Sequence, residues 1–135
     1  MFIFHHLRLR LRRRAIRRPN ARARAHFLAH KERARELVAR KIPELNALPG
    51  YGFAVGRVAI RNQKSRWGSC SARGNLNFNY RVAFLPERLV DYVVVHELCH
   101  LRELNHSAAF WALVAQAVPD WRVKRRELRM IERSF

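Results

Sequence analysis

The chain has 135 residues, enough for one domain with one hydrophobic core, and its hydrophobic content of 49% excludes wholesale disorder. Its 28 lysines and arginines outnumber 10 acidic residues, and the resulting formal net charge of +18 favours polyanionic partners. No apolar run approaches the ~20 residues of a membrane span, and residues 1–4 are too few for the apolar core of a secretory signal. Two cysteines cannot form a disulfide framework. We therefore expect a cytoplasmic protein.

Residues 1–25 form an arginine-rich segment that we expect to be poorly ordered or the remnant of a strand. Leu7, Leu9 and Leu11 alternate with arginines at the period of a strand, but Pro19 soon interrupts the pattern. A block of like charges attracts phosphate groups, which predicts a nucleic-acid-binding arm. The candidate contacts are Arg8, Arg10, Arg12, Arg13, Arg14, Arg17 and Arg18. The alternative is a basic leader that binds nothing specific, and the absence of aromatic residues between these arginines gives no indication of base stacking.

Residues 26–135 are expected to form the folded domain, beginning with a helix that is followed by strands. Apolar residues recur at helical spacing from about residue 26 to 48, and Pro43 is placed to kink or end this helix before a turn at Pro49 and Gly50. Alternating apolar residues predict a strand over residues 53–60 and one or two more over residues 76–84. The stretch between them, residues 61–73, is polar and rich in turn residues.

Three helices are predicted after these strands. Pro86 opens the first, which should end near residues 104–105. Ser107 can cap the second, which Pro119 stops, and Asp120 can cap the last. A helix, then strands, then three helices predicts the α+β class.

The first of these helices carries an HExxH motif at residues 96–100. On a helix, His96 and His100 lie one turn apart, so both imidazoles can reach one ion, and Glu97 is placed to hold water rather than to bind the metal. Burying these three side chains without partners would cost several kcal/mol, and a metal satisfies all of them together. The alternative is a pair of ordinary histidines beside a solvated glutamate.

His106 is the candidate third ligand, and it requires the helix to break. In a continuous helix it would face away from His100, so we expect a break after about residue 104, with Asn105 in the left-handed conformation and Ser107 starting the next helix. Three imidazoles favour zinc and leave a fourth position open for water. His106 could instead be an exposed corner residue, and the rival third ligands are the carboxylates of Glu103, Glu127 and Glu132.

Two cysteines and two tryptophans lie near these motifs and are interpreted as structural. The spacing of Cys99 does not make it a ligand, and we expect it to pack in the core. Cys70 could be a reactive thiol or a metal ligand, but a small buried side chain is the favoured interpretation. Trp67 and Trp111 are assigned to the core rather than to a substrate platform.

Three segments resemble a known family more specifically than the pentad alone. They are residues 63–71 (QKSRWGSCS), 74–81 (GNLNFNYR) and 91–100 (DYVVVHELCH) with 105–107 (NHS) and 110–111 (FW). From about residue 30 to 130 the chain closely resembles the YgjP-like metallopeptidase family, which is related to the SprT-like and WLM zinc proteases. Members of that family usually carry a longer, strand-rich N-terminal part, in whose place the arginine-rich segment stands here.

The resemblance implies a compact zincin-like domain, in which a small antiparallel or mixed sheet packs on the HExxH helix and further helices follow. It implies zinc ligation by His96, His100 and His106, with Glu97 as the catalytic acid/base. The predicted function is therefore a zinc metallopeptidase that acts on a protein or peptide, in which Glu97 takes a proton from the zinc-bound water.

Two other functions stay open at this stage. The first is a nucleic-acid-associated module whose zinc is structural or vestigial, which rests on the net charge of +18. The second is a metal-dependent hydrolase of a non-peptide bond, such as a phosphoanhydride. If the substrate is a peptide, a strand within residues 53–60 or 76–84 could present an edge to it.

Overall fold

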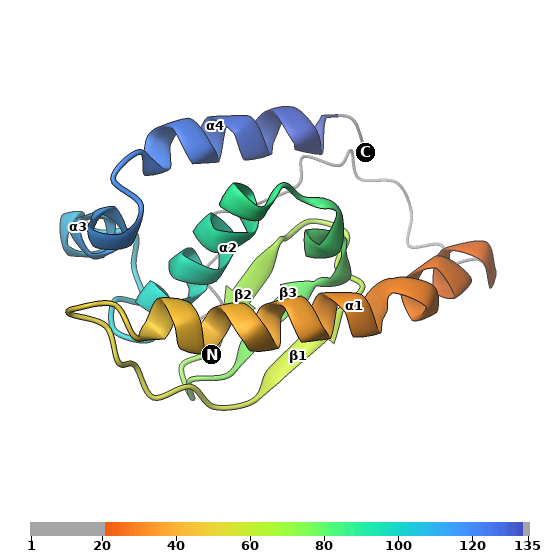
Figure 1. The fold of residues 1–135 in the computed structure, drawn as a ribbon, viewed down its shortest axis with the longest axis horizontal. Helices are drawn as coiled ribbons and strands as arrows, with labels where there is room; N and C mark the ends of the chain where they lie inside the picture. Colours follow the sequence, from red (N-terminus) through yellow and green to blue (C-terminus); the bar gives the residue numbers. More distant parts are fainter. Residues whose placement is uncertain (1–20, 134–135) are drawn as a thin grey trace.

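The computed structural model describes residues 21–133, which form a small sheet packed against the first two α-helices, with two further helices beyond the second (Figure 1). The elements in chain order are α1 (Ala21–Asn46), β1 (Val58–Arg61), β2 (Gly68–Cys70), β3 (Leu76–Asn79), the 3-10 helix η1 (Tyr80–Phe84), α2 (Glu87–His100), α3 (Ala108–Ala117) and α4 (Trp121–Glu132). The predicted α+β class is confirmed. Every helix within residues 21–133 falls short of what a bilayer span requires in length or in apolar character.

The sheet is mixed and has the strand order β1-β3-β2. β1 runs parallel to β3, with Val58 opposite Leu76, whereas β2 runs antiparallel to β3, with Gly68 opposite Phe78. Because β3 is the central strand, the segment predicted at residues 76–84 does not provide an edge. The edges of the described sheet belong to β1 and β2.

Helix α2 lies at the centre of the domain and positions the HExxH motif inside it. It contacts α1, β2, α3 and α4, and Figure 1 shows it between α1 and α4. From Leu89 to His100 every residue except Asp91 is buried. A helix that is buried on all sides belongs to the core, which explains the run of three valines before His96.

Helix α1 begins before residue 26, where the helix was predicted to start, and continues past Pro43, which was predicted to kink or end it. It starts at Ala21, so residues 21–25 are helical, and the prediction of an irregular segment or strand remnant is wrong there. The candidate nucleic-acid contacts from Arg8 to Arg18 lie outside the described residues. Pro43 lies inside α1, which continues to Asn46. The buried face of α1 packs against η1 and α2. Tertiary packing of this kind stabilises a helix even where it contains an unfavourable residue such as proline.

Two predicted strands are shorter in the structure, in each case because asparagine side chains bind the backbone. The side chain of Asn46 accepts hydrogen bonds from the backbone N–H groups of Gly52 and Phe53, so the chain stays irregular until β1 begins at Val58. The side chain of Asn79 caps η1 by accepting from the backbone N–H of Arg81. Residues 80–84 are therefore helical, and β2 lies in residues 61–73, the polar stretch rich in turn residues for which no strand was predicted.

Candidate metal centre

Three imidazole side chains converge at the C-terminal end of α2. The Nε2 atom of His100 lies 3.2 Å from that of His96 and 3.0 Å from that of His106, and the third separation is 3.4 Å. Among residues 21–133 these three side chains form the group of potential ligands that could hold a metal ion. The two HExxH histidines are buried and His106 is half-buried.

The turn after α2 brings His106 back to the other two rings. The helix ends at His100, about four residues earlier than predicted, and the backbone N–H of Glu103 bonds to the carbonyl of Cys99. Asn105 is not left-handed, because no non-glycine residue between 21 and 133 has a positive φ. As predicted, Ser107 caps α3: its hydroxyl accepts from the backbone N–H of Phe110.

The geometry of the three nitrogens fits a tetrahedral ion. Zinc–nitrogen bonds of about 2.0 Å place pairs of ligand atoms about 3.3 Å apart, which matches the separations of 3.0–3.4 Å. The Nδ1 atom of His100 donates to the backbone carbonyl of Glu103 at 2.9 Å. This bond fixes the tautomer, so the lone pair of the His100 Nε2 points into the group of nitrogens.

The carboxyl group of Glu97 lies deep in the same region. The residue is 2% exposed, and its Oε2 atom has no hydrogen-bond partner within residues 21–133. Burial raises the pKa of Glu97 to about 8, although the nearby charge of Arg66 opposes the shift. A carboxyl group that can hold or release a proton near neutral pH is suited to general acid and base chemistry.

Gly68 of β2 allows this carboxyl group to occupy its position. A Cβ atom on Gly68 would lie 2.9 Å from the Cγ atom of Glu97 and 3.1 Å from the backbone oxygen of Asn77. Such distances are too short for an unrelaxed contact. Sequence reasoning missed this role because Gly68 lies far from the HExxH motif in the chain, and glycine in a turn-rich stretch predicts only a turn.

Aromatic side chains of α3 form one wall of the histidine group. The ring of Phe110 stacks on His100 at 4.4 Å between centroids, and the ring of Trp111 lies 5.8 Å from His96 and 5.9 Å from His106. Trp111 is half-buried and packs against the core, as expected, and its ring also lies beside the histidines. Trp67 is fully buried, as expected.

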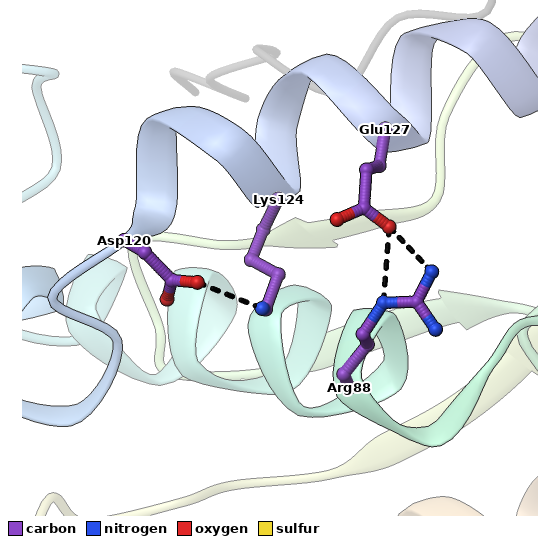
Figure 2. A network of polar contacts seen from close by, with 4 residues as sticks. All are labelled: Arg88, Asp120, Lys124 and Glu127. Carbon is purple, nitrogen blue, oxygen red and sulfur yellow. Dashed lines mark hydrogen bonds and ion pairs between the residues drawn. The ribbon is translucent and has the colours of Figure 1, made fainter.

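The rival carboxylates of the sequence interpretation are engaged elsewhere. The carboxylate of Glu127 accepts from Arg88, as Figure 2 shows, and that of Glu132 accepts from the indole N–H of Trp67. Glu103 contributes its backbone carbonyl to His100. None of these carboxylates belongs to the group of potential ligands found in residues 21–133.

Both cysteines are buried and bind neighbouring groups. The thiol of Cys99 donates to the hydroxyl of Tyr51, and that of Cys70 donates to the backbone carbonyl of Ser71, each at 3.4 Å. Burial raises the pKa of both thiols to about 12. The thiolate forms that bind metals and act as nucleophiles are therefore disfavoured.

The comparison with known families agrees with the resemblance in the sequence. Residues 7–130 match the model of the YgjP-like metallopeptidase domain. The chain belongs to the YgjP-like metallopeptidase family. No curated protein matches this family member. It is similar to a solved structure described as the crystal structure of the metallopeptidase zymogen of Pyrococcus abyssi abylysin, with 26% identity over 70% of this chain and 87% of that chain and a TM-score of 0.47.

Proposed function

We propose that this YgjP-like protein is a zinc-dependent peptidase, with His96, His100 and His106 as the metal ligands and Glu97 as the acid/base. The observation that carries the proposal is the convergence of three Nε2 atoms at the spacing of a tetrahedral ion, beside a buried carboxyl group. Membership of a metallopeptidase family supports the reaction class. Three imidazole donors favour zinc among the common divalent ions.

The residues of the site have separate tasks in this proposal. Bound zinc would supply a Lewis acid that polarises the scissile carbonyl and acidifies water. The Glu97 carboxylate accepts the proton of the attacking water and returns it to the leaving amine. His100 is held in its ligating tautomer by the carbonyl of Glu103.

Strand β2 is the proposed place for the substrate backbone. It contacts α2, and within the described sheet it pairs only with β3. All three of its residues are buried, so an extended peptide would reach its other edge only after the covering chain moves aside. Gly68 of this strand lies against the Glu97 side chain. A peptide that pairs with β2 would therefore pass close to the proposed acid/base.

Two variants test the proposal. Glu97→Gln should retain stoichiometric zinc and lose turnover by at least ~1000-fold, since the acid/base is removed and the ligands are kept. His106→Ala should lose most of its zinc at limiting free metal. The measurements are metal analysis of the purified proteins by mass spectrometry and hydrolysis of unstructured protein substrates. Hydrolysis by Glu97→Gln at the wild-type rate would contradict the assigned base, and full zinc occupancy in His106→Ala would contradict the third ligand.

Nucleic acid is a separate proposed partner of the arginine-rich segment. The proposal is supported by the net charge of +18 and by the block of arginines between Arg8 and Arg18. It concerns binding alone, because neither the histidines nor Glu97 belongs to this block.

A further inference from the structure

Four arginines of α4 line a cavity and form no ion pair within residues 21–133. Arg122, Arg125, Arg126 and Arg129 line, together with Trp121, a cavity of about 240 Å³. Their spacing of three or four residues places them on one side of the helix. No ion pair within residues 21–133 involves any of these four side chains.

The acidic residues nearest in the chain already have other partners. Figure 2 shows Glu127 bound to Arg88 of α2, at 2.5 and 3.0 Å, and Asp120 bound to Lys124, at 2.9 Å. The carboxylate of Glu132 accepts from Trp67. Apart from the electrostatic interaction between Arg129 and Glu132, none of these acidic side chains pairs with an arginine of the cavity, which favours an anion as its occupant.

Two aromatic rings connect this cavity to the histidine group. The ring of Trp111, which lies 5.8 Å from His96, stacks on Trp121 at 3.9 Å. The guanidinium carbon of Arg125 lies 5.6 Å from the centroid of the same Trp111 ring. The distances from His96 to Trp111 and from Trp111 to Arg125 together equal the length of about three or four residues of an extended peptide, which advances about 3.3 Å per residue.

Two buried donors between α2 and α4 also lack partners. The Tyr92 hydroxyl and the Arg125 Nε atom are buried and have no hydrogen-bond partner among residues 21–133. The two side chains lie close enough to interact, because the charge of Arg125 acts on the Tyr92 phenol, as do the charges of Glu97 and Arg129. Burial and repulsion from Arg129 lower the pKa of Arg125. A bound anion would relieve the repulsion between Arg125 and Arg129, and Arg125, which lines the cavity, would donate to it.

We propose that this arginine pocket binds the carboxylate side chain of an acidic residue in the peptide substrate, within about four residues of the scissile bond. The inference rests on the proposed peptidase function. A guanidinium group matches a carboxylate through two parallel hydrogen bonds. The cavity is separated from the histidines by the stacked rings of Trp111 and Trp121, and Trp121 is buried, so its ring offers no open face on which a base could stack.

The test uses the zinc-loaded full chain and matched pairs of fluorogenic peptides. Each pair differs only by glutamate or glutamine at one position, placed in turn up to four residues on either side of the scissile bond. At one position the glutamate peptide should have a kcat/KM about tenfold higher, through a lower KM, and the preference should fall as salt is added. The double substitution Arg125→Gln and Arg129→Gln should abolish the preference. The matched control, Arg24→Gln with Arg33→Gln, removes the same charge from α1 and should retain it.

The outcomes separate the pocket from the peptidase function. Cleavage of both peptides at equal kcat/KM at every position would overturn the acidic subsite and leave the peptidase proposal standing. Failure to cleave any peptide, combined with selective binding of the glutamate peptide to zinc-loaded Glu97→Gln, would overturn the peptidase function and support the pocket. The wild-type comparison needs no substitution, and Arg129→Gln alone serves if the double variant does not fold.

Nucleic acid is the competing occupant in the same assay. A short single-stranded oligonucleotide is titrated against the peptide at equal ionic strength. Tighter binding of the oligonucleotide than of the glutamate peptide, lost in the Arg125 and Arg129 double variant, would overturn the assignment to an acidic peptide. If the double variant still binds the oligonucleotide, the oligonucleotide binds outside the arginine pocket, and the assignment of the pocket to an acidic peptide stands.

Discussion

The buried carboxyl group of Glu97 depends on a neighbour that lacks a side chain. Gly68 faces its Cγ and Cδ atoms, and the backbone oxygen of Asn77 closes the same space from β3. The glutamate therefore has little freedom to move toward β2. The proposed role of Glu97 therefore requires a glycine at position 68, because a side chain there would displace the carboxyl group.

Gly68→Ala should disturb the site while leaving the ligands in place. The added Cβ would meet Glu97 Cγ at 2.9 Å, so the glutamate must shift. We expect hydrolysis to fall at least ~10-fold, zinc content to stay unchanged and stability to fall by about 1–3 kcal/mol, the usual cost of overpacking. Urea denaturation, metal analysis and peptide hydrolysis measure the three effects.

A double-mutant cycle identifies the cause of that loss. In a Glu97→Ala background the space beyond Gly68 is empty, so Gly68→Ala should cost about 1 kcal/mol less than in the wild type. An equal cost in both backgrounds would attribute the strain to the Asn77 carbonyl and contradict the contact with Glu97.

The sequence predicted the group of histidines because their spacing encodes it. One helical turn separates His96 from His100, and Ser107 marks the start of the next helix, so His106 had to lie in the corner between them. The position of the helix end could not be predicted as well. The structure ends α2 at His100, where the Glu103 carbonyl accepts from the imidazole, and no propensity scale includes that bond.

Among the elements, helices were easier to predict than strands. β2 has only three residues, Gly68 to Cys70, all buried, so it lacks the alternation by which a strand is recognised. Residues 80–84 do alternate, yet they form η1 because the buried side chain of Asn79 caps them. In both cases tertiary contacts outweigh the local pattern.

Helices α1 and α2 are linked by one buried cation. The Nζ atom of Lys41 lies 2.5 Å from Glu87 and 2.8 Å from Asp91, and its side chain is 3% exposed. The hydrogen bonds to Asp91 and Glu87 raise the pKa of Lys41, while Lys41 lowers the pKa of Glu87. The charged forms of these side chains therefore stabilise the packing of α1 on the helix that carries the histidines.

Lys41→Met should lower the free energy of unfolding by about 2 kcal/mol at pH 7, since it leaves Asp91 half-buried without its cation. The difference in the free energy of unfolding between the wild type and Lys41→Met should be greatest between pH 4.5 and pH 10.5, the ordinary pKa values of Glu87 and Lys41. It should shrink as the pH falls through the lowered pKa of Glu87, because the folded state then takes up a proton there. It should also shrink as the pH rises from 10.5 through the raised pKa of Lys41, because the unfolded chain loses this proton first. Urea denaturation across this pH range measures the difference.

The matched control for that series is Arg35→Met. Arg35 pairs with Glu32 on the exposed side of α1, and pairs of this kind contribute little. Its cost should stay below ~0.5 kcal/mol at every pH. A loss as large as that of Lys41→Met would indicate a general effect of removing charge from α1.

At the scale of the whole molecule, a metal that binds the folded chain should stabilise it. The histidines lie in the core between α2 and α3, so an ion held there binds the native state in preference to the unfolded chain. Chelation should lower Tm by roughly 10 °C, and added zinc should restore it. Differential scanning calorimetry with and without a chelator measures the shift.

A distant histidine provides the control for this measurement. His30 lies on α1 against Phe84, away from the group of ligands. His30→Ala should keep the full shift on chelation, whereas His106→Ala should lose most of it. A Tm that does not respond to the chelator in the wild type would contradict metal binding by the folded protein.

The proposed ligands lie within residues 96–106, whereas Gly68 reaches Glu97 only through the docking of β2. Short-range contacts close early in folding, because they order little chain, and contacts between distant segments close late. We therefore expect the nascent polypeptide to capture its ion before it becomes an active enzyme. A partly folded intermediate would then carry metal without being able to cut its neighbours.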